Sequence, residues 1–258
     1  MKNLVLTTLI GDCPKYALPI FEKYCNKYNL DLHVITERVV NWRDLYYEKF
    51  LAVELLDKYD RILFIDGDVL ITPQAPNIFE YYPDPTFFYA FHENGYSGQN
   101  NRDGFVKETL QGFGDRFIAW PKEWNGKLRY FNSGVMLFSK QHQKALSNFR
   151  EVDEITGSLP ISEQTCLNAI VTLYNLPYYN MEWSWNRGDL GVPDPNLQRY
   201  QSNFIHYSGQ GYTFYSKATS KYDILRSDMG FLYPEFSYTD LPMELQQFDL
   251  LYRKGYNV

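Results

Sequence analysis

Cysteine is scarce in this sequence, which has only three, Cys13, Cys25 and Cys166, among its 258 residues. An odd and unclustered set of this kind argues against a disulfide scaffold and against a zinc site, both of which need several cysteines at set spacings. It is typical of proteins in a reducing compartment. We therefore expect a cytoplasmic protein.

Long apolar runs and an excess of positive charge are also missing. No apolar run has the roughly 20 residues that a transmembrane helix needs, so we expect no transmembrane segment. The first ten residues, MKNLVLTTLI, contain two threonines, and no cleavage site of small residues follows them. They predict a core strand rather than a signal peptide. The formal net charge of −6 disfavours a broad nucleic-acid surface, so we expect no nucleic-acid partner.

Apolar, β-branched stretches alternate with stretches of helical periodicity in the N-terminal part of the chain. They predict strands at residues 4–9, 32–35 and 61–65 and helices at residues 14–28 and 46–59. This order is typical of an α/β protein with a mainly parallel sheet, right-handed crossovers and flanking helices. Ligands of such sheets bind beyond the carboxyl ends of the strands. Asp66 and Asp68 fall at that edge.

The rest of the chain predicts strands at residues 87–91, 130–138 and 204–207 and helices at residues 141–153, 162–174 and 243–252. The connection at residues 92–129 is polar and rich in glycine, and a connection of this length usually carries function or small elements of its own. No repeat or low-complexity linker divides the chain. We therefore expect a single domain over residues 1–258.

The triplet Asp66-Gly67-Asp68 is the first candidate site. In an extended segment, residues two apart point to the same side, so both carboxylates can meet one cation. Such hard oxygen ligands suit Mg²⁺ or Mn²⁺, which bridge phosphate oxygens in nucleotide sites. Gly67 would let a ligand approach the backbone closely. The alternative is a solvated acidic turn, but the preceding apolar residues 62–65 place the triplet at the mouth of a core strand and favour the metal site.

Five motifs in this order carry a resemblance to a known family: Tyr47-x-Lys49, residues 55–70 with the sequence LLDKYDRILFIDGDVL, Phe131-Asn132-Ser133-Gly134-Val135, Glu163-Gln164-x-x-Leu167-Asn168, and Phe204-Ile205-His206-Tyr207-x-Gly209. Together they resemble glycosyltransferase family 8, which includes glycogenin and the lipopolysaccharide galactosyltransferases. The resemblance covers roughly residues 3–210. It implies a Rossmann-like GT-A fold, a nucleotide-sugar donor that is usually a UDP-sugar, Mn²⁺, and retention of the anomeric configuration.

The resemblance also implies roles for individual residues. Asp66, Asp68 and His206 would hold the metal, and their mixed carboxylate and imidazole set favours Mn²⁺, with Mg²⁺ as the alternative. Gln164 would lie at the reacting centre, with Glu163 beside it. The expected contacts to the donor come from Thr7 and Thr8 near the nucleoside, Tyr16 on the base, Lys49 on phosphate or sugar, Asn132 and Ser133 on the sugar, and the motif glycines Gly67 and Gly209. For Lys49 a solvated surface charge is the competing interpretation.

The chain departs from the family pattern in three places. Glu163 replaces the commoner Asp, and Gly67 replaces the usual Ala, which is a mild change. After Gly209 the family often has Lys-Pro-Trp, whose lysine contacts the departing diphosphate, whereas this chain continues Gln-Gly-Tyr-Thr-Phe. Lys217 or Lys221 could substitute for that lysine, although neither is aligned with it.

We expect residues 1–91 to form the nucleotide-binding half and residues 92–258 the acceptor side. A glycan or glycoconjugate acceptor would be recognised by residues 92–130 and by the segment 183–187. In that segment Trp183 and Trp185 would point the same way if it were extended, and they either wall a sugar ring or belong to the core. The sequence thus predicts a metal-dependent hexosyltransferase. The alternatives are a catalytically lapsed nucleotide-sugar or glycan binding protein and, less favoured, a nucleotidyltransferase or phosphohydrolase.

Overall fold

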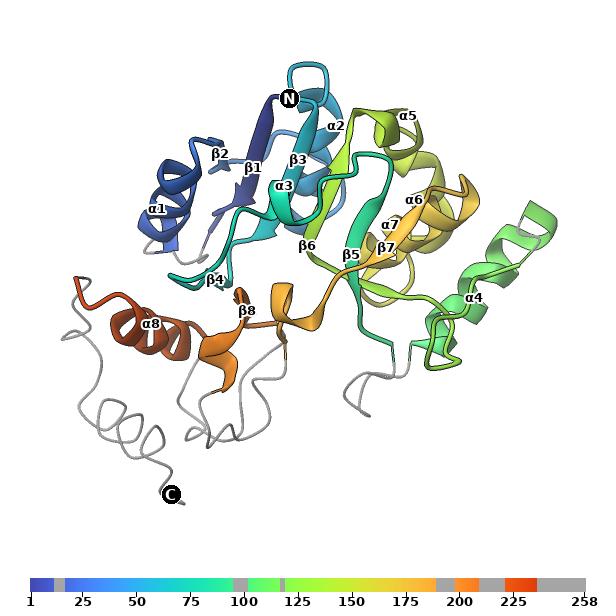
Figure 1. The fold of residues 1–258 in the computed structure, drawn as a ribbon. Helices are drawn as coiled ribbons and strands as arrows, with labels where there is room; N and C mark the ends of the chain where they lie inside the picture. The colour runs from blue at the N-terminus through green and yellow to red at the C-terminus, as the bar shows by residue number, and fades with distance from the viewer. Residues whose placement is uncertain (12–16, 95–101, 117–118, 189–197, 209–220, 236–258) are drawn as a thin grey trace.

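A central sheet of six strands, in the order β2-β1-β3-β6-β5-β7, organises the molecule (Figure 1). The structure is a computed structural model and describes residues 1–11, 17–94, 102–116, 119–188, 198–208 and 221–235. The strands are β1 (Asn3–Thr8), β2 (Asp31–Ile35), β3 (Arg61–Asp66), β5 (Phe88–His92), β6 (Phe131–Ser139) and β7 (Tyr178–Asn180). Strand β6 runs antiparallel to its neighbours β3 and β5, whereas the other pairs are parallel. The predicted α/β architecture with a mainly parallel sheet is confirmed.

A second, two-stranded sheet pairs β4 (Val69–Ile71) with β8 (Phe204–His206) in antiparallel fashion. Val69 lies opposite His206, and the backbone N–H of Tyr207 donates to the carbonyl of Asp68 over 2.9 Å. The sequence predicted β8 but not β4. The small sheet brings the segment that follows the Asp66-Gly67-Asp68 triplet next to a strand from the far end of the described chain.

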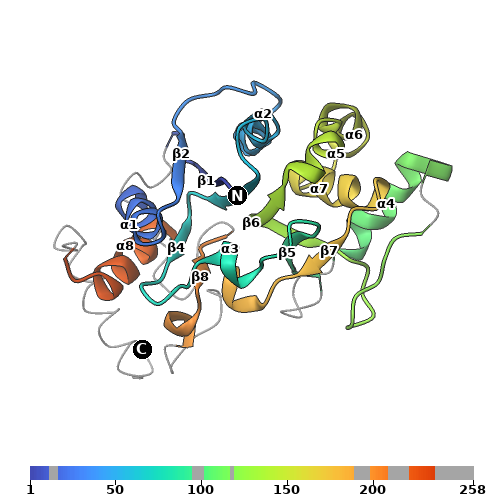
Figure 2. The ribbon, with the colours of Figure 1, turned by 45° about the horizontal axis from the view of Figure 1, so that its top comes forward.

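Helices cover both faces of the central sheet, as Figure 2 shows. The α-helices are α1 (Leu18–Tyr28), α2 (Ala52–Leu55), α3 (Ile78–Tyr81), α4 (Asp103–Phe113), α5 (Gln143–Leu146), α6 (Phe149–Thr156), α7 (Ser162–Leu173) and α8 (Lys221–Leu232). Shorter 3₁₀ helices span Leu45–Leu51, Gly114–Arg116, Lys140–His142, Trp183–Trp185 and Gln198–Gln201. Among the helices of the described segments, none combines the length and apolar character needed to cross a bilayer.

The core is divided by the central sheet into two apolar layers. Along β3, Leu63 and Ile65 face the layer that contains α1, α3 and α8, whereas Ile62 and Phe64 face the layer that contains α4, α5, α6 and α7. Alternate residues of a strand point to opposite faces, so a strand that is apolar throughout is buried on both sides. The end of β3, with Asp66, therefore leaves the core at the edge of the sheet.

The helix predicted at residues 46–59 is broken in the structure. A 3₁₀ helix over Leu45–Leu51 precedes the short α2, and its residues 47–51 are all buried, including the charged Glu48 and Lys49. Three consecutive side chains there serve separate partners: Tyr47 donates to Asp153, Glu48 accepts from the backbone of residues 39–41, and Lys49 enters the candidate site. These tertiary contacts override the α-helical periodicity.

The helix predicted at residues 141–153 is also broken, into a 3₁₀ turn, α5 and α6. The break falls at Ser147 and Asn148, whose side chains donate to the carbonyl of Lys144 over 2.8 and 2.7 Å. Polar side chains that bond to the backbone of the preceding turn compete with helix continuation. The helix predicted at residues 14–28 begins at Leu18 and ends before Asn29, which adopts the left-handed conformation with φ of 52°. The helix predicted at residues 243–252 lies outside the described residues.

Candidate active site

Two carboxylates and one imidazole meet at the edge of the central sheet. Asp66 ends β3, Asp68 lies in the turn before β4, and His206 ends β8. One ligand atom of each lies within 4.8 Å of the others. Nε2 of His206 is 3.4 Å from Oδ1 of Asp68 and 3.9 Å from Oδ2 of Asp66. The three residues that the sequence predicted as metal ligands are therefore brought together.

The triplet differs from its predicted conformation, because Gly67 and Asp68 form a turn rather than an extended segment. Gly67 is also explained by a different contact from the one expected. A Cβ atom at this position would lie 2.4 Å from the carbonyl oxygen of Thr8 and 2.7 Å from a side-chain carbon of Leu9. Gly67 thus allows close packing of the turn on the end of β1. The replacement of Ala by Gly is consequently not a mild change in this chain.

The orientation of His206 is set by its neighbours. Its Nδ1 is 2.8 Å from Oδ1 of Asn186, an arrangement that directs Nε2 toward the carboxylates. The ring packs directly over Gly134, where a Cβ atom would lie 2.2 Å from Cε1 of the imidazole. An outer partner on the second nitrogen of a ligating histidine fixes the tautomer and the ring plane.

The donor set fits a divalent cation. Burial and the neighbouring Asp68 raise the pKa of Asp66, against the opposing effects of Lys49 and His206. Like charges held this close disfavour full ionisation of both carboxylates. A cation between them would remove that penalty, and two carboxylate oxygens with one imidazole nitrogen are ligands that suit Mn²⁺ and accommodate Mg²⁺.

Lys49 lies in the interior beside this cluster. Its Nζ is 3.1 Å from Oγ of Ser133, 3.1 Å from Oε1 of Glu163 and 3.7 Å from Oδ1 of Asp66. Only 3% of the side chain is exposed, so the interpretation as a solvated surface charge is wrong. Burial lowers the pKa of the Lys49 ammonium, but Asp66 and Glu163 raise it, and the net shift is upward. A buried positive charge therefore lies next to the acidic cluster.

Gln164 and Asn132 are connected by a carboxylate that the sequence analysis missed, Glu93. Its Oε1 accepts from Nε2 of Gln164 over 3.0 Å, and its Oε2 accepts from Nδ2 of Asn132 over 3.0 Å. The Gln164 carbonyl oxygen in turn accepts from the backbone N–H of Ser133 over 3.1 Å. These bonds orient the Gln164 amide, with its nitrogen toward Glu93 and its oxygen toward Ser133.

A continuous series of hydrogen bonds runs from the metal-ligand candidate His206 to Gln164. Nδ2 of Asn186 donates to Oδ1 of Asn132 over 2.9 Å. Asn132 in turn donates to Glu93, which also accepts from Gln164. Asn186 also escaped the sequence analysis. Both missed residues had a positional signal: Glu93 lies two residues after the strand predicted at residues 87–91, and Asn186 lies in the segment 183–187 that was already of interest.

Thr7 and Thr8 lie at the carboxyl end of β1, and Thr8 is paired with Asp66 in the sheet register. Both side-chain hydroxyls are buried, and within the described part of the chain neither has a hydrogen-bond partner. Consecutive residues of a strand point to opposite faces, so only one of the two hydroxyls can face any given ligand. Tyr16 and Gly209 lie outside the described residues, as does Lys217.

The segment with the two tryptophans is a 3₁₀ helix, Trp183–Trp185, and not an extended strand. Trp185 is fully buried and packs against the rings of Tyr81, Tyr82 and Phe204. Trp183 is partly buried, with the guanidinium carbon of Arg187 4.2 Å from its ring centroid. The two rings do not form a common wall, so the interpretation of Trp185 as a core residue is the correct one.

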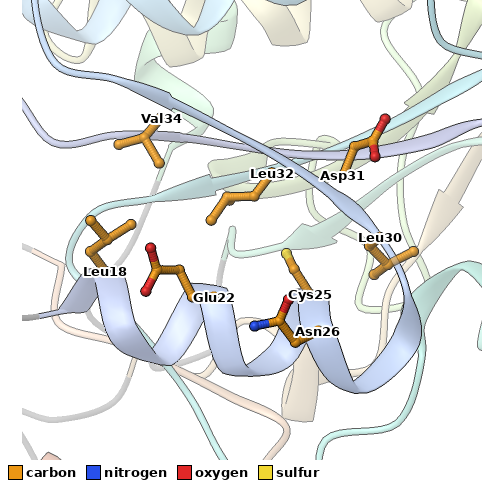
Figure 3. A pocket seen from close by; sticks show the side chains of 8 residues that line it. All are labelled: Leu18, Glu22, Cys25, Asn26, Leu30, Asp31, Leu32 and Val34. Carbon is orange, nitrogen blue, oxygen red and sulfur yellow. The ribbon is translucent and has the colours of Figure 1, made fainter.

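A pocket of about 490 Å³ lies elsewhere, between α1 and the edge strand β2. Figure 3 shows Leu18, Glu22 and Cys25 on the helix below Leu32 on the strand. The residues that line it are Leu18, Glu22, Cys25, Asn26, Leu30, Asp31, Leu32 and Val34. It contains no predicted site residue, and the described chemistry lies at the sheet edge instead.

Solved structures of similar fold are glycosyltransferases. A glycosyltransferase involved in the glycosylation of the major capsid of PBCV-1 matches with a TM-score of 0.54 and 15% identity, over 83% of this chain and 96% of that chain. The galactosyltransferase LgtC, in complex with donor and acceptor sugar analogs, matches with a TM-score of 0.53 and 14% identity, over 95% of this chain and 99% of that chain. GlyE of Streptococcus pneumoniae TIGR4 matches with a TM-score of 0.51 and 13% identity, over 97% of this chain and 64% of that chain. The fold is therefore that of the GT-A glycosyltransferases.

The family of the chain follows from its sequence. The family model described as "Glycosyl transferase family 8" matches residues 21–211, which include all three metal-ligand candidates. No curated protein sequence matches the chain. The chain belongs to glycosyl transferase family 8, and it is a glycosyltransferase enzyme.

Proposed function

We propose that this enzyme is a retaining hexosyltransferase that moves a hexose from a nucleotide diphosphate sugar, a UDP-sugar, to a hydroxyl group of a glycan or related acceptor. One observation carries the proposal: the cluster of Asp66, Asp68 and His206 adjoins a buried lysine. The 3.7 Å between Nζ of Lys49 and Oδ1 of Asp66 joins the two groups. With a divalent cation bound, a site of this kind would bring positive charge to the place where an acidic protein binds an anionic donor.

Asp66, Asp68 and His206 would hold Mn²⁺, with Mg²⁺ as the alternative. When bound, the cation supplies Lewis-acid stabilisation of the negative charge that develops on the diphosphate. Lys49 places a second positive charge beside it. The contacts to the donor that we propose are Thr7, Thr8 and Tyr16 toward the nucleoside, Gly67 and Gly209 along the diphosphate, and Asn132 and Ser133 on the sugar.

The acceptor hydroxyl attacks from the face that the diphosphate leaves and gives its proton to a phosphate oxygen. Gln164 and Glu163 stabilise the positive charge on the anomeric carbon. Oε1 of Glu163 is paired with the Lys49 ammonium and accepts a hydrogen bond from the Ser133 hydroxyl. Both contacts lower the nucleophilicity of the carboxylate, so they support an electrostatic role for Glu163 over that of a covalent nucleophile.

The site draws on both proposed halves of the chain. Asp66 and Asp68 belong to the nucleotide-binding half, residues 1–91, whereas His206 belongs to the acceptor half, residues 92–258. The scarce cysteines support a cytoplasmic location for the enzyme.

The experiment that tests the proposal is a screen of UDP-sugars and other nucleotide sugars, with and without Mn²⁺, by thermal shift. Each donor that binds is then tested for hydrolysis and for transfer to free sugars. Metal-linked binding stabilises the folded state by mass action, so we expect a shift that depends on both donor and metal. The anomeric configuration of the product, read by NMR, tests retention.

Asp68→Asn keeps the shape of the side chain and removes its charge, so donor turnover should fall to background. Asp115→Asn, at an exposed residue of the 3₁₀ helix Gly114–Arg116, is the control and should behave as wild type. Full turnover by Asp68→Asn would refute the metal-assisted mechanism. Donor binding by a folded wild-type protein that shows neither transfer nor hydrolysis would favour the lapsed binding protein.

A further inference from the structure

Trp124 is the one tryptophan of this chain that the solvent reaches freely. The chain has 5 tryptophans, and Trp124 is 79% exposed, whereas Trp120 and Trp185 are buried and Trp42 and Trp183 are partly buried. An indole ring is among the largest apolar surfaces that a side chain can offer, and an exposed one forgoes the stabilisation of burial. A single exposed aromatic residue needs no explanation by itself. Its setting in the fold, however, is specific.

Trp124 lies at the tip of a well-defined hairpin. Lys122 and Leu128 form an antiparallel bridge, the N–H of Glu123 donates to the carbonyl of Lys127 over 2.9 Å, and that of Gly126 donates to the carbonyl of Glu123 over 2.8 Å. Gly126 adopts a positive φ of 74°, which a glycine reaches without strain. The hydrogen-bonded backbone of the tip therefore fixes the point from which the indole extends into solvent.

The hairpin is fastened to the active-site edge of the sheet through Asn94, which is fully buried. Nδ2 of Asn125 donates to the carbonyl of Asn94 over 2.9 Å, and Nδ2 of Asn94 donates to the carbonyl of Leu128 over 2.8 Å. Asn94 directly follows Glu93, whose carboxylate accepts from Gln164. Asn125, the residue after Trp124, thus contacts Asn94, and Asn94 is next in sequence to Glu93, the hydrogen-bond partner of Gln164.

The same junction includes the start of α4. The N–H of Arg102 donates to Oδ1 of Asn94 over 2.9 Å, and Nε of Arg102 donates to Oε1 of Glu93 over 2.8 Å. Nδ2 of Asn94 also donates to Oδ1 of Asp103 over 2.8 Å. A saccharide held on the hairpin would therefore rest on a framework that is continuous with the side chains around Gln164.

The hairpin and the metal-ligand candidates lie at different strands of the sheet edge. The hairpin leads directly into β6, whose first residue, Phe131, pairs with His92 at the end of β5, whereas the metal-ligand candidates lie at β3 and at the small sheet of β4 and β8 (Figure 1). The proposed metal site therefore lies at one part of the sheet edge, and the hairpin borders another.

We infer that Trp124 is a stacking platform for a pyranose ring of the acceptor, which would be an oligosaccharide or glycoconjugate of at least two sugar units. The inference rests on the proposed transfer to a glycan. An indole offers an apolar plane against which the C–H face of a sugar packs, and the polar side chains of the hairpin can bond to its hydroxyls. The unit on Trp124 is bound but not glycosylated, so Trp124 determines acceptor specificity without contacting the reacting atoms.

The test uses a glycan array probed with the full-length protein in the presence of UDP and Mn²⁺, in wild-type, Trp124→Ala and Trp124→Phe forms. We expect the wild type to bind a saccharide, Trp124→Ala to lose at least ten-fold in apparent affinity, and Trp124→Phe, which keeps an aromatic plane, to retain most of it. Tyr174→Ala is the control, since Tyr174 is 39% exposed at the end of α7 that is remote from Gln164, and it should not change binding.

Equal binding by Trp124→Ala and wild type would overturn the inference, and so would the absence of any saccharide binding by the wild type. The thermal shift with donor and Mn²⁺ is measured on the same variants and should be unchanged in Trp124→Ala. A lost donor shift in the wild type would refute the proposed function, whereas an intact donor shift with no effect of Trp124→Ala would refute only the platform. With a defined acceptor in hand, Trp124→Ala should raise KM for the acceptor and leave kcat and donor hydrolysis unchanged.

Discussion

Replacement of Gly134 by alanine tests whether the fold holds the imidazole of His206 in place for a cation. The added Cβ would lie 2.2 Å from Cε1, 2.8 Å from Nδ1 and 2.9 Å from Nε2 of His206. Non-bonded carbon atoms prefer separations of about 3.5–4.0 Å, so the ring must retreat by about 1.3 Å. His206 is only 4% exposed, and its surroundings leave little room for that movement.

The retreat changes the two contacts that define the ring position. It would break the 2.8 Å bond between Nδ1 and Asn186, and it would alter the 3.4 Å separation between Nε2 and Asp68. Loss of an outer partner of a metal ligand typically lowers metal affinity by about 10–100-fold. In free energy this is about 1.4–2.8 kcal/mol. Overpacking of a buried site costs a further ~1–3 kcal/mol of stability.

The assay is a Mn²⁺ titration, followed by calorimetry or by the EPR signal of the free ion, with circular dichroism as a measure of folding. Gly104→Ala is the matched control, because a Cβ at Gly104 in α4 meets no atom within 4 Å. If Gly134→Ala does not fold, Asn186→Ala removes the partner of Nδ1 without adding an atom and should lower Mn²⁺ affinity by ~10-fold. Wild-type Mn²⁺ affinity in a folded Gly134→Ala variant would refute the reasoning.

Three further predictions concern stability. Gly67→Ala places a Cβ 2.4 Å from the carbonyl oxygen of Thr8, so Tm should fall with a loss of ~1–3 kcal/mol, and an unchanged Tm would contradict the packing argument. Lys49→Met leaves Glu163 buried without its cation, and urea denaturation should show a loss of ~3–5 kcal/mol; a loss below 1 kcal/mol would count against a tightly paired lysine. Burial raises the pKa of Glu48, but hydrogen bonds from three backbone N–H groups and from an arginine lower it, and the net shift is downward. The ionised Glu48 therefore stabilises the folded state above the unfolded-state pKa of about 4.3, and this stabilisation is lost as pH falls through the lower folded-state pKa. Glu48→Gln should therefore destabilise the protein by ~1–3 kcal/mol at pH 7 and show a smaller further loss on acidification than the wild type, as measured by urea denaturation at each pH.

Five of the six strands of the central sheet were predicted, and the inner ones could be predicted because burial on both faces requires apolar residues. The short strand β7, which is only partly buried, was not predicted. Residues 61–65 and 130–138 were each placed to within one residue of β3 and β6. The helices were less predictable where side chains took up individual partners, as at residues 47–49 and at Ser147 and Asn148. Periodicity reports which face is buried, but it does not report such separate contacts.

The metal-ligand candidates could be predicted because each lies in a motif of the family. Glu93 and Asn186 could not be predicted in the same way, since their roles depend on side chains that lie far away in the sequence. Glu93 meets Gln164 only because β5 and α7 pack on the same strand, β6. Likewise, nothing local identifies Gly134 as the residue that makes room for His206. The metal-ligand candidates are thus visible in the sequence, whereas the residues that orient them become visible only in the fold.

The pairing of β4 with β8 has a consequence for the order of events during protein synthesis. A ribosome completes every strand of the central sheet, up to β7, before it reaches the codon for His206. A nascent chain arrested at that point has both carboxylates but lacks the imidazole. Long-range pairing of this kind is late and slow in folding, since the loop must close before any contact forms. The proposed metal site is therefore completed only when β8 pairs with β4, in one of the later folding steps.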